Sequence, residues 1–64
     1  MGKTRDYEHT IRNPLLSARE REEAMRALLS MRPSRHKTKA LREIRDNPML
    51  EYHFRQQAKM ELDR

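Results

Sequence analysis

The side chains best suited to chemistry are cations gathered in the middle of the chain. Between residues 32 and 45 the sequence has six Lys or Arg residues and a single anion, Glu43. Arginine binds a phosphate or a carboxylate through two parallel hydrogen bonds, so such a cluster is typical of an anion-binding surface. The sequence predicts a nucleic-acid-binding surface, for DNA or structured RNA, made of Arg32, Arg35, Lys37, Lys39, Arg42 and Arg45.

The spacing of these cations indicates a helix with one basic side. On a helical wheel Arg35, Lys39 and Arg42 fall within about 60 degrees of each other, opposite the apolar residues of the same segment. Residues 35–37 would lie in the first turn, where the helix dipole attracts anions and disfavours cations. A bound phosphate would relieve that conflict. A helix-turn-helix, with this helix in the major groove, is the more specific form of the hypothesis.

Other reactive side chains lack the spacing that catalysis or metal binding requires. The three histidines, His9, His36 and His53, have no second histidine three or four residues away, and the chain has no cysteine. A zinc site needs several such ligands brought together. The sequence shows no glycine-rich phosphate loop and no nucleophile paired with a base. We expect no enzyme activity, no metal site and no cofactor.

Composition favours a fold made only of helices. Of 64 residues, 10 are Leu, Ile or Phe and none is Val, whereas 34 are Ala, Glu, Lys, Leu or Arg. Few β-branched residues disfavour a sheet, and many strong helix formers favour an all-α chain. The first residues are too polar for a signal peptide, and no segment approaches the roughly 20 apolar residues that cross a bilayer. We expect a soluble, intracellular, cytoplasmic protein without membrane contact.

Proline and asparagine divide the chain into segments. Residues 1–12 are polar and show no helical period, which predicts a flexible tail before a single helical domain at residues 13–64. Within that domain we expect a small three-helix arrangement, with helices at about 14–31, 35–46 and 48–62.

A short motif occurs twice in the chain. Asn13-Pro14-Leu15-Leu16 recurs 34 residues later as Asn47-Pro48-Met49-Leu50. In both places an asparagine can cap a helix whose first residue is proline. Ser17 with Glu20 offers a competing capping box, so the first helix has two candidate starts. The repeat predicts two helices with similar starts and similar packing.

Methionines beside the predicted apolar stripes support a second function. Methionine adapts to the shape of a partner's groove. A protein-binding adaptor or inhibitor would dock on a larger, acidic protein through the face formed by Met49, Leu50, Phe54 and Leu62. Self-association into a homodimer is another way to cover that face. Both alternatives stay open beside nucleic-acid binding.

Overall fold

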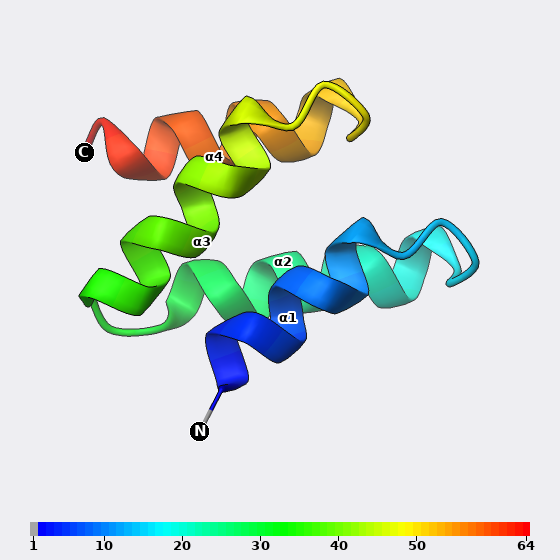
Figure 1. Cartoon of the computed structure of the whole chain (residues 1–64), viewed down its shortest axis with the longest axis horizontal. Helices are drawn as coiled ribbons and strands as arrows, with labels where there is room; N and C mark the ends of the chain where they lie inside the picture. The colour runs from blue at the N-terminus through cyan, green and yellow to red at the C-terminus, as the bar shows by residue number, and fades with distance from the viewer. Residues whose placement is uncertain (1) are drawn as a thin grey trace.

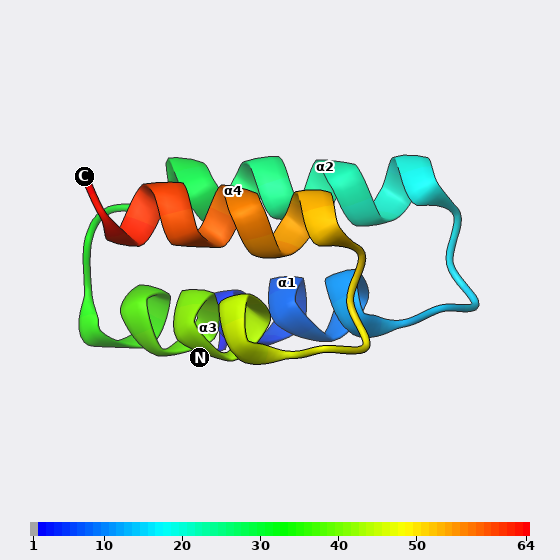
Figure 2. The ribbon, with the colours of Figure 1, turned by 90° about the horizontal axis from the view of Figure 1, so that it is seen from above.

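Four helices make up the part of the chain that the computed structural model describes, residues 2–64. They are α1 (Lys3–Arg12), α2 (Ala18–Ser30), α3 (Arg35–Asp46) and α4 (Tyr52–Leu62). Consecutive helices pair as two hairpins, α1 with α2 and α3 with α4 (Figure 1). The hairpins pack so that α1 and α3 form one layer and α2 and α4 the other (Figure 2). The all-α class predicted from composition is confirmed.

The core lies between the two layers. Its ten buried apolar side chains are Ile11, Ala24, Met25, Leu28, Ala40, Leu41, Ile44, Leu50, Phe54 and Ala58. All four helices contribute to this set. Burial of apolar surface is the main stabilising contribution to folding, and a chain this short needs every element to take part.

Helix α1 replaces the flexible tail predicted for residues 1–12. Ile11 is fully buried and Tyr7, one turn earlier, packs against the core, so the segment has an apolar contact face. Glu8 is also buried on α1. Because a charged residue stands among the buried ones, the sequence of this segment shows no regular spacing of apolar residues. The three-helix prediction was therefore one helix short over the described residues. Met1 lies outside them.

Both Asn-Pro motifs form turns between the helices of a hairpin. The side-chain oxygen of Asn13 accepts a hydrogen bond from the backbone N–H two residues later at 2.9 Å. Its backbone oxygen accepts one from the N–H three residues later at 3.2 Å. Asn47 accepts the same two bonds at 2.9 and 3.2 Å. Asparagine is suited to this role because its side chain reaches the backbone just ahead of it.

The turns delay the starts of two helices. Helix α2 begins at Ala18 and α4 at Tyr52, four residues after the predicted starts at 14 and 48. Ser17 is the N-cap of α2: it accepts from the N–H of Glu20 and donates its own N–H to that carboxylate, both at 3.1 Å. Helix α3 keeps its predicted bounds, with Ser34 as N-cap. Both turns lie at one end of the molecule, opposite the α2–α3 loop (Figures 1 and 2).

Candidate nucleic-acid interface

The net charge of the molecule lies on one side of it. Helix α2 has three Arg and three Glu, and residues 51–64 have three cations and three anions, so the α2–α4 layer sums to zero. Helix α1 has three cations and two anions, and α3 has five cations and two anions. Together with Arg32, in the loop before α3, these two helices account for the full +5. The net positive charge of the sequence is therefore carried by residues of α1, α3 and the loop before α3.

Three of the predicted cations stand on the exposed side of α3. Arg35, Lys39 and Arg42 are exposed, and all three line a shallow depression along the helix. The opposite side of α3 is fixed in the core by Leu41 and Ile44. Packing of the apolar side thus decides which way the basic side faces.

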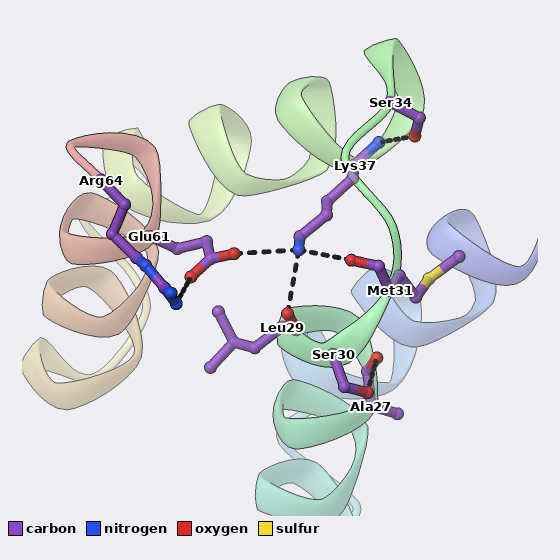
Figure 3. A network of polar contacts seen from close by, with 8 residues as sticks. All are labelled: Ala27, Leu29, Ser30, Met31, Ser34, Lys37, Glu61 and Arg64. Carbon is purple, nitrogen blue, oxygen red and sulfur yellow. Dashed lines mark hydrogen bonds and ion pairs between the residues drawn. The ribbon is translucent and has the colours of Figure 1, made fainter.

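Lys37 does not belong to this exposed side. Its side chain is 4% exposed, and its ammonium donates to the backbone oxygens of Leu29 at 2.9 Å and Met31 at 2.6 Å. A third bond goes to Glu61 Oε2 at 2.9 Å (Figure 3). All three donors of the ammonium are used inside the protein, so the structure removes Lys37 from the predicted phosphate contacts. The sequence does carry a signal for this, since Lys37 precedes Leu41 by four residues and shares its apolar side.

The buried ammonium of Lys37 sits at the C-terminal end of α2. The last carbonyl groups of a helix lack partners within it, and this end of the helix dipole is negative, so a cation is stabilised there. The hydrogen bond from Lys37, with a second from Arg64, lowers the pKa of the Glu61 carboxyl. The predicted conflict between cations and the α3 dipole therefore no longer includes Lys37 and applies to Arg35, which is exposed.

The remaining two predicted cations differ in their surroundings. Arg32 is exposed in the loop before α3. Arg45 is half-buried, and its guanidinium donates to both carboxylate oxygens of Asp46, at 2.8 and 3.1 Å. These bonds lower the pKa of the Asp46 carboxyl and keep it charged. Arg45 is thus largely neutralised by its neighbour, whereas Arg32 remains available at the edge of the layer.

Helix α1 adds cations that were predicted to lie in a flexible tail. A second depression lies between α1 and α3 and is lined by Arg5, His9 and Arg12 on one side and by His36 and Lys39 on the other. His36 and Lys39 line the first depression as well, so the two adjoin. We call the exposed Arg and Lys residues that line these two depressions the basic surface: Arg5, Arg12, Arg35, Lys39 and Arg42.

The fold separates the residues of the predicted protein-binding face. Leu50 and Phe54 are buried in the core, and Leu62 is half-buried against it. Met49 is 88% exposed at the tip of the second turn. A partner cannot reach Leu50 or Phe54 in the folded protein, so these four residues do not form one docking surface.

Comparisons with protein-family models, with curated proteins and with solved structures give no match to this chain. None of the helices in residues 2–64 is long and apolar enough to pass through a membrane. The same residues contain no group of three or more His, Asp or Glu side chains placed to hold a metal ion. The candidate interface is therefore defined by the charge and geometry of the α1–α3 layer.

Proposed function

We propose that this chain is a small nucleic-acid-binding protein, accessory or regulatory in role, that contacts phosphates through the basic surface. The observation that carries the proposal is the one-sided distribution of charge. Helices α1 and α3 with Arg32 carry the full +5, of which the buried Lys37 accounts for one charge, and the residues of the α2–α4 layer sum to zero. A protein whose charges only keep it soluble does not need its net charge on one of its two layers.

Binding by these side chains is mainly electrostatic. Arg35 and Arg42 can each bind a phosphate through two hydrogen bonds, and Lys39 between them adds a point charge. Each neutralised phosphate releases condensed counterions, which makes affinity fall as salt rises. Arg5 and Arg12 extend the contact from one helix to two. Contacts of this kind position a protein on nucleic acid without reading the bases, so we expect weak sequence preference.

The test compares two triple variants of equal charge. The first, Arg35→Gln with Lys39→Gln and Arg42→Gln, removes three cations from the basic surface. The second, Arg19→Gln with Arg26→Gln and Lys59→Gln, removes three exposed cations from the α2–α4 layer. Binding to a duplex DNA of about 20 base pairs and to an RNA hairpin is measured by fluorescence anisotropy at two salt concentrations.

The first triple variant should bind far more weakly, and its slope of log affinity against log salt should be shallower by about two to three. The second should change affinity only slightly. Circular dichroism checks that both variants keep their helices. Equal losses of affinity in the two variants would mean that net charge alone binds nucleic acid and would reject the basic surface as the site.

A second candidate function, a protein-binding adaptor or inhibitor, is favoured by apolar side chains that the core leaves outside. Tyr52 and Met60 are 68% and 61% exposed on α4, and Met49 precedes them. The test is the variant Met49→Ser with Met60→Ser. This candidate predicts a complex with a protein partner, or with a second copy, that resists moderate salt and is lost in the variant. A complex that survives both substitutions would reject it.

A further inference from the structure

Two carboxyl groups meet where α1 packs against α3. Glu8 of α1 is buried, with its side chain 10% exposed, and it lines one depression together with Glu43 of α3, so that a proton can bond the two carboxyl groups to each other. Arg12 Nη1 lies 3.4 Å from Glu8 Oε2 on the other side. Ionised carboxylates only accept hydrogen bonds, so this pair needs one proton between its two members.

The proton belongs to Glu8. Burial, followed by the hydrogen bond and the negative charge of Glu43, raises the pKa of Glu8 to about 7, although Arg12 opposes the shift. The pKa of the exposed Glu43 carboxyl is lowered, first by the hydrogen bond from Glu8 and then by the cations around it. Near neutral pH, Glu8 therefore exchanges between a neutral and an ionised form, and Glu43 stays ionised.

The groups around this pair belong to the basic surface and its edges. Those facing it are Arg5, His9 and Arg12 from α1 and His36, Lys39, Arg42 and Asp46 from α3. When Glu8 ionises, a second negative charge appears among the cations that would meet phosphate. A negative charge added among these cations weakens the attraction of an anion.

We propose that protonation of Glu8 controls phosphate binding at the basic surface. The inference rests on the proposed function. Neutral Glu8 leaves Glu43 as the one charged member of the pair, whereas ionised Glu8 adds a second negative charge that repels phosphate and Glu43. The coupling is reciprocal, so a bound nucleic acid makes Glu8 hold its proton more tightly, and binding near neutral pH takes up a proton.

The same proton affects folding without any nucleic acid. The pKa of Glu8 is raised above its ordinary value of 4.5, so between about pH 4.5 and 7 the folded chain holds a proton that the unfolded chain releases. The stability due to this group is present at acidic pH and is lost as the pH rises towards 7. The carboxyl carbon of Glu8 should titrate near pH 7 in a ¹³C NMR experiment, and a midpoint at the ordinary value overturns the proposal.

The binding test removes the histidines first, because imidazole groups also gain charge in this pH range. In a background of His9→Gln with His36→Gln, Glu8→Gln holds the side chain in its neutral shape. As a matched control, Glu22→Gln removes one exposed carboxylate from α2. Affinity for a duplex DNA of about 20 base pairs is measured at about pH 6 and about pH 8, at equal ionic strength.

The background and the Glu22→Gln protein should both lose affinity by about two- to fourfold from pH 6 to pH 8. The Glu8→Gln protein should lose none, and at pH 8 it should bind as tightly as the background does at pH 6. Equal pH dependence in all three proteins overturns the proposal while leaving the proposed function intact. Absence of DNA binding by the unaltered chain at both pH values rejects the proposed function, and the control by Glu8 falls with it.

Discussion

In both helical hairpins an asparagine holds the turn through a side-chain hydrogen bond of 2.9 Å, and a leucine follows three residues later. The leucines differ in depth, since Leu50 is buried and Leu16 is half-buried. The two turns nevertheless have the same backbone hydrogen bonds, because a turn of this kind depends only on residues next to it in the sequence. Beyond the turn, corresponding residues in the two hairpins have different roles.

The position after each turn motif illustrates the difference. Ser17 caps α2 with its own side chain, within a single hairpin. Glu51, in the corresponding place before α4, makes no side-chain cap and instead receives two hydrogen bonds from Arg21 of the first hairpin, at 2.9 and 2.7 Å. One hairpin stabilises its own helix at this position, and the other uses it to join the two halves.

Two pairs of cations at the 34-residue offset show the same divergence. Lys37 is buried among three oxygen atoms, whereas Lys3 is exposed. Arg21 is buried and donates from Nε to the backbone oxygen of Ile11 at 2.8 Å. Arg55 has a buried Nε with no hydrogen-bond partner in residues 2–64. The repeated pattern thus sets the helices and turns, and unrepeated contacts fix how the hairpins fit together.

The largest effect is expected from Lys37→Met. This change leaves Glu61 without its buried cation and two carbonyl groups without a donor, which should lower the free energy of unfolding by about 3 kcal/mol. The matched variant Lys3→Met should change it by less than about 0.5 kcal/mol, because that side chain is exposed. Urea unfolding followed by circular dichroism measures both. Similar losses would show that burial does not distinguish the two lysines.

Arg21→Gln should have the next largest effect and lower the free energy of unfolding by about 2 kcal/mol. It breaks the contact between the hairpins and leaves the backbone oxygen of Ile11 without a donor. Arg55→Gln should be neutral or slightly stabilising, since it removes a buried nitrogen that has no partner. The same unfolding experiment compares them. If Arg55→Gln lowers the free energy of unfolding more than Arg21→Gln does, Arg21 is not the residue that holds the two hairpins together.

The contact between Arg21 and Glu51 also has a pH signature. The hydrogen bonds from Arg21 lower the pKa of the Glu51 carboxyl. Its contribution to stability is therefore present above the ordinary pKa of 4.5 and is lost as the pH falls through the lowered value. The difference in stability between the unaltered protein and Arg21→Gln should shrink in acid. A difference that stays constant would assign the effect to packing over Phe54, whose ring centroid lies 5.3 Å from the guanidinium carbon.

The sequence predicts the features of this molecule that depend on local pattern. The bounds of α3, its cap at Ser34 and its exposed cations follow from helical spacing and capping alone. The buried face of α1 was missed because it includes Glu8, and a charged residue normally indicates solvent. The spacing of Lys37 to Leu41 indicates the apolar side of α3, but the three partners of its ammonium lie 6 to 24 residues away and cannot be predicted from local pattern.

Asn13→Ala and Asn47→Ala test the asparagine turn that both hairpins share. Each removes one side-chain hydrogen bond to the turn, and each should lower the free energy of unfolding by about 1 kcal/mol. Because the two turns do not share partners, the double variant should lose about the sum. Thermal unfolding of the three variants measures this. Clearly unequal losses would show that the common backbone geometry hides different contributions to stability.

The smallest effects are expected at the tips of the two turns. Leu15 and Met49 occupy the same position in the motif and are 91% and 88% exposed, so neither contributes to the core. Leu15→Ser and Met49→Ser should change stability by less than about 0.5 kcal/mol and leave phosphate binding unaltered, because the basic surface lies on α1 and α3. Both tips lie at the same end of the molecule (Figure 2). Loss of a salt-resistant complex in the Met49 variant, with nucleic-acid binding intact, would assign the two functions to separate surfaces.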